Sequence, residues 1–157
     1  MKQNYQAEVA PRIEKKIARA VLTGANVSLK FSTEICNQIR GKPAKKVEVF
    51  LTRLSEKKDF LALPRYNKKV AHRKGDSVHG TKSGRYPQKT ANALLGLLQS
   101  AMANADYRGL DAEKLVVLNA FASMAFGRPS FQTRGKIGGK RRKRKSCHVE
   151  IVLLEAA

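Results

Sequence analysis

Residues 127–146 read GRPSFQTRGKIGGKRRKRKS and carry nine Lys or Arg but no Asp or Glu. Two apolar runs flank this stretch, LVVLNAFASMAF at 115–126 and CHVEIVLL at 147–154. The second run alternates apolar and polar residues, which is typical of a strand with one buried face. Both runs therefore predict strands that pair in a sheet. Hairpin loops usually need two to five residues, so a basic connection of about twenty residues requires another explanation.

The basic connection predicts a long, extended finger. If its two halves continue as antiparallel arms, each arm has about nine residues beyond the sheet, which gives a finger on the order of 30 Å long. Gly135, Gly138 and Gly139 allow the backbone to bend, so we expect them to mark the tip. A finger without a core needs an external partner to order it, and Arg side chains bind phosphate in a bidentate manner. A solvated basic linker, or a nuclear-localisation signal at KRRKRK (140–145), is the alternative.

The composition of the whole chain points in the same direction. The chain has 157 residues, which predicts one domain, and 32 Lys and Arg against 12 Asp and Glu give a net charge of +20. Such a charge favours a polyanionic partner, nucleic acid first and an anionic membrane second. No apolar run approaches the roughly 18 residues of a spanning helix, so we expect no membrane partner. Cys36 and Cys147 belong to no CxxC pair, and we expect reduced, partly buried thiols, with a disulfide as the alternative.

The periodicity of apolar residues predicts three helices before the two strands. Ser28 is the expected N-cap of the first helix, with its hydroxyl accepting a hydrogen bond from an early backbone N–H, and this helix stops at Gly41. Pro43 opens the second helix, which runs to about Lys58, and Pro87 opens the third, which ends near 107–109. The predicted apolar faces are Phe31, Ile35 and Ile39; Val47, Phe50, Leu51 and Leu54; and Ala91, Leu94, Leu95, Leu98, Ala101, Met102 and Ala105. Residues 4–10 alternate as in a short strand, whereas residues 11–27 fit no single element. Helices followed by antiparallel strands predict an α+β fold.

A second basic segment covers residues 61–89 and holds eight Lys or Arg. It contains Gly and Pro without clear periodicity, so we expect an extended surface segment of the kind that often carries function. If about ten of the cations in the two basic regions met phosphates, the affinity would fall with salt at a log–log slope of roughly −7 to −9. That dependence suits permanent residence in a large RNA. A chromatin-type DNA-binding protein is the alternative.

The residues give little support for an enzyme or a metal site. GDSVHGTKS (75–83) approaches the phosphate-binding loop G-x-x-x-x-G-K-[ST], but Thr81 occupies the lysine position and no strand core precedes it. His72 and His79 lack the further ligands that zinc needs, so we interpret His72 as a phosphate or base-edge donor. His148 is expected on a strand as a surface or packing residue. We therefore predict no catalytic residue, no metal and no cofactor.

Four ordered blocks carry a family resemblance: RYNKKVAHRKG (65–75), GRYP (84–87), NADYRGLDAEKL (104–115) and CHVEIVLLE (147–155). From about residue 28 to residue 155 the chain resembles the universal large-subunit ribosomal protein twenty-two family, in its archaeal and eukaryotic-type form. The resemblance implies three helices against a three-stranded antiparallel sheet. It also implies an extended hairpin, roughly 117–153, that reaches the nascent-peptide exit tunnel with its tip near 128–136. The whole chain would form a single ribosomal-protein domain.

The resemblance also implies partners and a place in the cell. Large-subunit ribosomal RNA, neighbouring ribosomal proteins and the nascent peptide would be the partners, and the protein would act in the cytoplasmic large subunit without forming a homo-oligomer. The tip candidates are Arg128, Phe131, Arg134 and Gly135. The expected RNA-binding residues lie in the second basic segment and in the basic hairpin. They are Arg65, Lys68, Lys69, His72, Arg73, Lys74, Arg85, Tyr86, Arg128, Arg134, Lys136, Lys140, Arg141, Arg142, Lys143, Arg144 and Lys145.

The sequence departs from the family pattern in the hairpin. The family's ascending arm and tip are usually rich in Arg and Lys, and a pattern close to R-A-x-G-R follows the tip. Here the ascending arm NAFASMAFG (119–127) is uncharged, RGKIGGK (134–140) stands at the place of that pattern, and the cations follow it.

Overall fold

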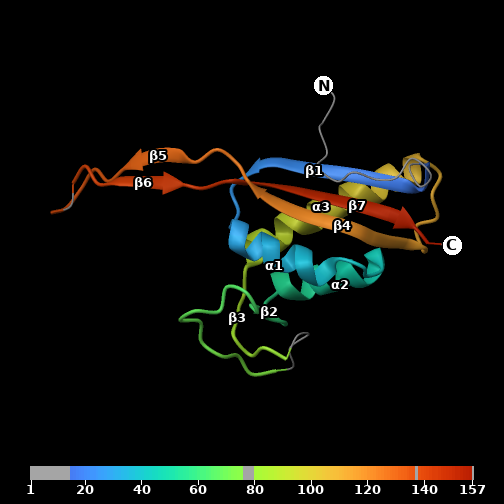
Figure 1. Cartoon of the computed structure of the whole chain (residues 1–157), viewed down its shortest axis with the longest axis horizontal. Helices are drawn as coiled ribbons and strands as arrows, with labels where there is room; N and C mark the ends of the chain where they lie inside the picture. The colour runs from blue at the N-terminus through green and yellow to red at the C-terminus, as the bar shows by residue number, and fades with distance from the viewer. Residues whose placement is uncertain (1–14, 76–79, 137, 157) are drawn as a thin grey trace.

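The computed structural model describes residues 15–75, 80–136 and 138–156. Within these residues the chain forms a three-stranded sheet, two two-stranded ribbons and three helices (Figure 1). This arrangement confirms the predicted α+β class. The strand expected at residues 4–10 lies outside the described residues.

The main sheet is antiparallel, with β7 (Cys147–Glu155) between β1 (Ile17–Ala25) and β4 (Leu115–Met124). The pairing of β4 with β7 runs from Leu115–Glu155 to Met124–Cys147, so the predicted pairing of the two apolar flanks is confirmed. β7 is the central strand and its middle is buried on both faces, including Val152. This burial on both faces explains the uninterrupted apolar run IVLL at residues 151–154 of β7.

Strand β1 lies within residues 11–27, for which the sequence predicts no single secondary-structure element. It pairs with β7 from Ile17–Leu154 to Ala25–Cys147, and the register shifts between Leu22 and Ala25. The sequence IARAVLTGA has small residues at its inward positions, where Ala18 and Ala20 are buried. Its larger apolar side chains are Ile17, Val21 and Leu22, and the four-residue spacing of the first two also fits a helix. The segment forms a strand and not a helix because it pairs with the central strand β7.

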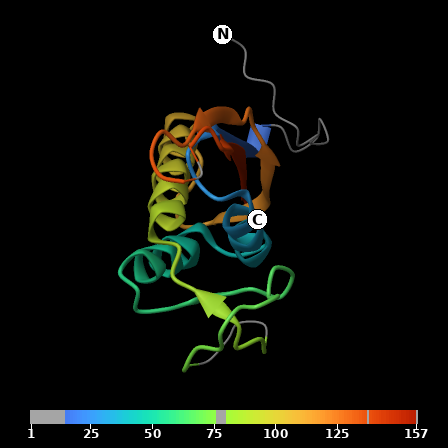
Figure 2. The same cartoon turned by 90° about the vertical axis from the view of Figure 1, so that its left-hand side faces the viewer.

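All three helices cover the same face of the sheet. α1 (Leu29–Ile39) packs against β4, α3 (Gln88–Tyr107) packs against β1 and β7, and α2 (Ala44–Ser55) packs against α3. Seen from the hairpin end, α3 stands beside the sheet, and the segment that follows α2 lies below the helices (Figure 2). The predicted apolar faces of the three helices are buried or half-buried, which confirms them.

The helix ends differ in detail from the sequence expectations. Ser28 has an extended backbone at the N-cap of α1, but its hydroxyl makes no capping hydrogen bond, so that part of the prediction is wrong. Gly41 follows α1 with φ +76°, the left-handed conformation that favours glycine. α2 ends at Ser55 and not near Lys58, because Lys57 leaves the helical region with φ +62°. Pro43 and Pro87 are N-caps, one residue before the first helical residue.

The core lies between the sheet and the helices and contains both cysteines. Ile35, Leu98 and Ile151 are fully buried at its centre. Cys36 and Cys147 are free and buried, which confirms the expected free thiols and places them deeper than predicted. Burial raises the pKa of the Cys36 thiol to about 12 and also raises the pKa of Cys147. Both side chains therefore act as small apolar groups of the core at neutral pH.

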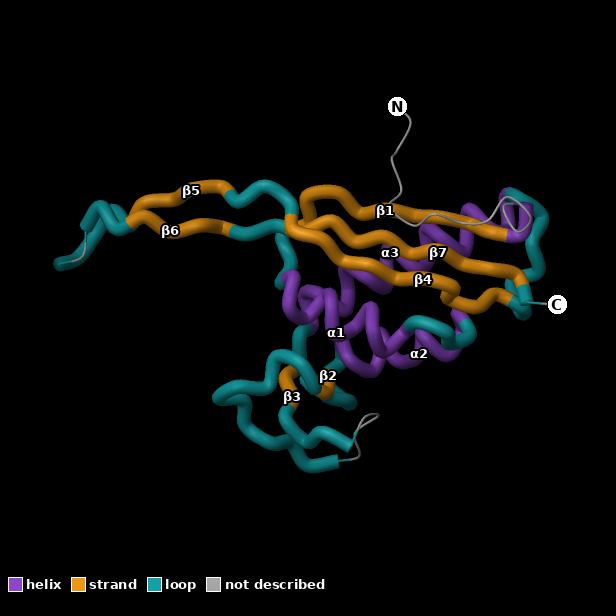
Figure 3. The backbone as a smooth tube through the Cα atoms, viewed as in Figure 1, coloured by secondary structure: helices purple, strands orange, loops and turns teal. Residues whose placement is uncertain are grey.

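Two parts of the chain project from this core. Beyond the sheet, the hairpin continues through β5 (Arg128–Phe131) and β6 (Arg141–Arg144), which pair with each other (Figure 3). We call residues 125–146 the ribbon. Below α1 and α2, β2 (Leu61–Ala62) pairs with β3 (Gly84–Arg85) and closes a long excursion of the chain. We call residues 63–86 the anchored loop.

Candidate nucleic-acid interface

The ribbon is a continuation of the main sheet without its core. Ala125 N–H donates to Ser146 O at 3.0 Å, and the register then moves by one residue before Arg128 pairs with Arg144. At the far end, Gly138 N–H donates to Gly135 O at 2.9 Å, and Gly139 N–H donates to the carbonyl of the ascending arm at 2.8 Å. Backbone hydrogen bonds thus extend along the described ribbon, as expected for two antiparallel arms.

The turn of the ribbon lies further along the chain than the family resemblance implied. Gln132 N–H donates to Lys140 O at 3.1 Å, so the turn lies between these two residues. The glycines that were expected at the tip lie there. Arg134 lies in the turn, whereas Arg128 and Phe131 belong to β5 and pair with the opposite arm. The placement of these last two at the tip is therefore wrong; whether any of the four candidates lines a tunnel stays a prediction.

Both faces of the ribbon are cationic. All four side chains of β6 are exposed, and successive side chains of a strand point to opposite faces. Arg141 and Lys143 therefore charge one face, and Arg142 and Arg144 charge the other. The guanidinium of Arg141 lies 5.9 Å from the centroid of the Phe131 ring. Arg142 donates to the side-chain oxygen of Gln132 at 2.6 Å, which orients it along the ribbon.

The anchored loop is held to the core by a buried carboxylate. Glu34 of α1 is 1% exposed, and its Oε1 accepts hydrogen bonds from the backbone N–H groups of Arg65 and Tyr66, each at 3.0 Å. Gln38, one turn further along α1, donates to Ala62 O at 2.8 Å. The loop therefore leaves the core along one side of α1. The expectation that all of 61–89 lies on the surface is wrong at its start, because Leu61 to Leu63 are buried.

The two strands of the loop come close together at Gly84. A Cβ atom at this position would lie 2.2 Å from Cδ2 of the Phe60 ring and 3.0 Å from Leu61 O. Further out, Arg73 N–H donates to Lys82 O at 2.7 Å, and His72 and Ser83 form a bridge. The described part of the loop is thus a narrow, hydrogen-bonded structure that presents its side chains outward.

Most of the RNA-binding residues predicted in the loop are exposed. Arg73 and Arg85 are half-buried, and both donate to Gly84 O at 3.3 Å. The Arg73 guanidinium also lies 5.3 Å from the ring centroid of Tyr86, which is 36% exposed. The remaining predicted residues of the loop are exposed: Arg65, Lys68, Lys69, His72 and Lys74.

The cations of both regions lack acidic partners within the described residues. The ion pairs there join Lys45 to Glu113, Arg53 to Asp59, Lys58 to Glu56 and Lys114 to Asp111, all outside the ribbon and the anchored loop. In the ribbon, the exposed predicted residues are Arg128, Arg134, Lys136, Lys140, Arg141, Arg142, Lys143, Arg144 and Lys145. The two regions together form a surface of uncompensated positive charge.

Sequence reasoning did not single out Lys30 and Lys89 as binding residues. Both are exposed, at the starts of α1 and α3, and they line a groove that also includes Lys145 and Tyr66. This groove joins the two basic regions. The starts of the two helices can be predicted from the sequence, but their proximity in the fold cannot.

The described residues contain no group of three His, Cys, Asp or Glu side chains that could hold a metal ion. In the stretch that approaches a phosphate-binding loop, residues 76–79 lie outside the described residues, and Ser83 is followed by β3 where such a loop needs a helix. His148 accepts a hydrogen bond from Gly24 N–H at 3.2 Å, which confirms it as a packing residue of β7. No helix of the described residues is both long and apolar enough to cross a membrane.

The fold and the surface define a small α+β protein with a basic, extended hairpin and no recognisable active site among the described residues. Comparison with known proteins gives its family. A sequence model of the family described as "Ribosomal protein L22p/L17e" matches residues 20–154. The chain belongs to this family of structural ribosomal proteins, which are not enzymes, and the resemblance noted in the sequence is confirmed.

The similarity to curated members of the family covers nearly the whole chain. The chain is 32% identical over 154 residues to the large ribosomal subunit protein uL22 of Methanococcus aeolicus, covering 98% of this chain and 97% of that protein. It is 40% identical over 134 residues to the uL22 of Archaeoglobus fulgidus, covering 78% and 85%. The uL22 of Methanocaldococcus jannaschii is 34% identical over 166 aligned residues, covering 98% and 96%.

Proposed function

We propose that this protein is a structural constituent of the large ribosomal subunit in the cytoplasm and binds large-subunit ribosomal RNA through the ribbon and the anchored loop. The observation that carries the proposal is the ribbon itself. Its cations face both sides, it buries no core of its own, and none of its cations has an acidic partner among the described residues. A ribbon of this kind is ordered by the anionic scaffold that it enters.

The two basic regions have different tasks in this proposal. The anchored loop is fixed to α1 through Glu34, so it presents a preformed surface to RNA. The ribbon projects past the core, neutralises phosphates on both faces and braces RNA segments that lie on either side of it. We further propose that its turn, between Gln132 and Lys140, reaches the wall of the nascent-peptide exit tunnel, where Arg134 contacts the passing peptide. Neighbouring ribosomal proteins complete the surroundings.

The proposal is tested by reversing the charge of β6. Cells express a tagged chain in which Arg141, Arg142, Lys143 and Arg144 are replaced by Glu, and lysates are sedimented at low and high salt. We expect the native chain to co-migrate with large subunits at both salt concentrations and the variant to remain in the light fractions, because its ribbon repels phosphate.

A matched control carries the same change of charge outside the ribbon and the anchored loop, at exposed lysines that take part in none of the four ion pairs. Replacing Lys15, Lys16, Lys46 and Lys57 by Glu is expected to leave most of the chain in large subunits. Normal incorporation of the β6 variant would contradict the proposal. Preference of the purified chain for duplex DNA over structured RNA in competition would favour a DNA-binding function instead.

A further inference from the structure

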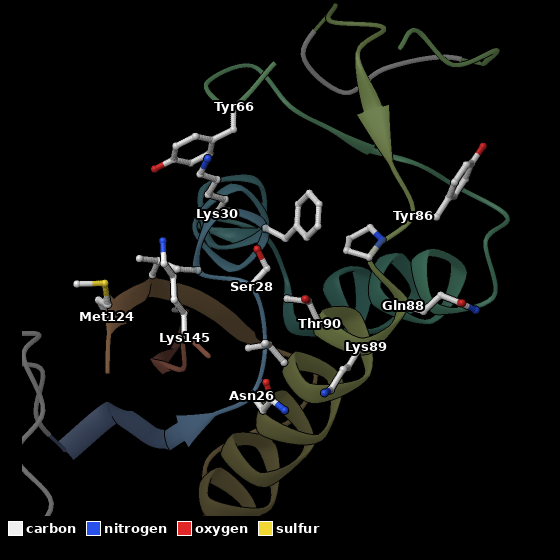
Figure 4. A pocket seen from close by; sticks show the side chains of 14 residues that line it. Asn26, Ser28, Lys30, Tyr66, Tyr86, Gln88, Lys89, Thr90, Met124 and Lys145 are labelled. Atoms are coloured by element: carbon white, nitrogen blue, oxygen red, sulfur yellow. The ribbon is translucent and has the colours of Figure 1, made fainter. Parts of the chain in front are cut away.

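A groove of about 750 Å³ lies where the ribbon, the anchored loop and the starts of α1 and α3 meet. In the view of Figure 4, Tyr66, Lys30, Lys145 and Met124 lie on the left side of the groove, Tyr86 and Gln88 lie on the right, and Ser28 and Thr90 lie between them. The volume is in the range of sites that hold small organic ligands. The groove joins the two basic surfaces, and nothing in the proposed function so far accounts for its shape.

The lining combines apolar side chains with cationic ones. Phe31, Pro87 and Met124 contribute apolar surface, and Lys30, Lys89 and Lys145 contribute positive charge, whereas no lining residue is acidic. Met124 is 68% exposed although it is a large apolar side chain. A ligand that is complementary to this lining has a flat apolar part and a negative charge.

Tyr66 offers an aromatic surface at the edge of the groove. The Lys30 ammonium lies 5.5 Å and the Arg65 guanidinium 5.6 Å from the centroid of its ring. The two backbone N–H bonds to Glu34 fix the chain at residues 65 and 66, so the position of the ring is set by the core. A base that stacks here would keep its phosphate within reach of these cations.

The helix starts add to the positive character of the groove. Neither α1 nor α3 carries an acidic residue in its first turn, the Ser28 hydroxyl does not cap α1, and the N-cap of α3 is Pro87, whose side chain has no acceptor. The partial positive charge of a helix N-terminus attracts anions. In this groove the two helix starts and the three lysines act in the same direction.

We propose that this groove binds one unpaired nucleotide of RNA, with the base against the apolar side chains and Tyr66 and the phosphate near the lysines. The inference rests on the proposed function, because it assumes that RNA is the partner of the two basic surfaces. It adds that the protein recognises an extrahelical base as well as phosphates. Recognition of unpaired bases by stacking and positive charge is common in RNA-binding proteins.

The test uses the purified full chain and three RNA hairpins that differ at one position. The first is fully paired, the second has a single extrahelical adenosine, and the third has an abasic residue in its place. We expect the adenosine hairpin to bind about tenfold more tightly than the other two, which corresponds to the usual contribution of one stacked base. With 2-aminopurine at the extrahelical position, binding should quench its fluorescence.

Two variants locate this preference in the groove. Ser28→Asp keeps a residue that is favoured at an N-cap, so the fold is retained, but it places a negative charge among the lysines. Ser100→Asp makes the same change on the exposed surface of α3, outside the groove. We expect the first to reduce the tenfold preference to about one and the second to leave it unchanged.

The aromatic contact is tested in the same way. Tyr66→Ala is expected to abolish both the preference and the quenching, and Tyr66→Phe to retain them. Tyr107→Ala, at a residue that is 92% exposed at the end of α3, is the control and should have no effect. In assembled large subunits, a photoreactive group at Met124 should cross-link to RNA.

The outcomes separate the inference from the proposed function. If the chain binds all three hairpins equally well with a steep salt dependence, the groove proposal is wrong and RNA binding stands. If the chain binds none of them, both are wrong. Equal affinity for the adenosine and abasic hairpins, a preference that survives Ser28→Asp and Tyr66→Ala, or a cross-link from Met124 to protein would each overturn the nucleotide site.

Discussion

The inner and outer halves of the long hairpin have the same backbone geometry and opposite chemistry. In the inner half β4 pairs with β7, and Ala120 and Ile151 face each other at full burial. In the outer half β5 pairs with β6, and Arg128 faces Arg144 in solvent. The inner ladder is stabilised by the core beneath it. The outer ladder has no core beneath it, and its Arg128–Arg144 pair places two like charges opposite each other, which is destabilising. We therefore expect a partner to contribute much of its stability.

The largest difference between the two halves should appear in their contributions to stability. Ile151→Ala removes a fully buried side chain from the central strand and should lower the free energy of unfolding by about 3–4 kcal/mol. Lys143→Ala, in exposed β6, should change it by less than about 0.5 kcal/mol. Chemical denaturation of the purified chain, followed by circular dichroism, measures both values.

The milder Ile151→Val keeps the comparison measurable if the alanine variant does not fold. It should cost about 1 kcal/mol, since only one methylene is lost. A loss of several kcal/mol in Lys143→Ala would show that the outer ladder stabilises the free protein, and the contrast between the two halves would then be incorrect.

The same contrast explains which parts of the fold were predictable from sequence. The helices and the pairing of β4 with β7 follow from apolar periodicity, which burial imposes on residues such as Leu98 and Ile151. The secondary structure of β1 could not be predicted, because its inward residues are alanines and its apolar pattern fits both a strand and a helix. The turn of the ribbon lies further along the chain than its predicted position near 128–136. The exposed residues Arg128 and Phe131 give no burial pattern from which the register of β5 and β6 could be predicted.

The candidate site also has parts that could be predicted from the sequence and parts that could not. The cations of the ribbon and the loop are visible in sequence as uninterrupted charge, so their exposure could be expected. The groove could not, because Lys30, Lys89 and Lys145 come from three separate segments and only the tertiary packing of the helix starts brings them together. Glu34 was also missed, because a single acidic residue on a helix gives no sign that it holds the backbone of a loop.

An intermediate effect is expected where the anchored loop meets the core. Gly84→Ala places a methyl group 2.2 Å from the Phe60 ring and 3.0 Å from a backbone oxygen, so the two strands must separate. We expect a loss of about 2 kcal/mol in the free energy of unfolding, as for other overpacked sites. Adding Phe60→Leu to this variant should recover part of the loss, because the smaller side chain has no ring at that place.

Gly96→Ala is the matched control for this substitution. Gly96 lies within α3, and a Cβ there meets no atom within 4 Å, so alanine should stabilise the helix by up to about 1 kcal/mol. If Gly84→Ala lowers the free energy of unfolding and Gly96→Ala raises it, the close approach of β2 and β3 is supported. A Gly84→Ala variant as stable as the native chain would mean that β2 and β3 separate without cost and that the loop is not preformed.

The smallest effect concerns the outer ladder itself. Arg128→Glu converts the like-charged pair with Arg144 into an opposite-charged one, which should favour the paired state of the free ribbon by about 0.2–1 kcal/mol. The N–H of Gln132, which donates to Lys140 O, should then exchange with solvent about twofold to fivefold more slowly in the free protein. Amide hydrogen exchange followed by NMR measures this rate.

Arg134→Glu makes the same change of charge in the turn, where the residue has no partner in the β5–β6 register. If cross-strand repulsion is what weakens the free ribbon, this control leaves the exchange of the Gln132 N–H unchanged while it lowers the affinity for RNA about as much as Arg128→Glu does. Equal slowing by both substitutions would instead trace the weakness to the net charge of the ribbon. A ribbon that gains order and loses RNA affinity through the same substitution would demonstrate that its cations are placed for a partner and against its own stability.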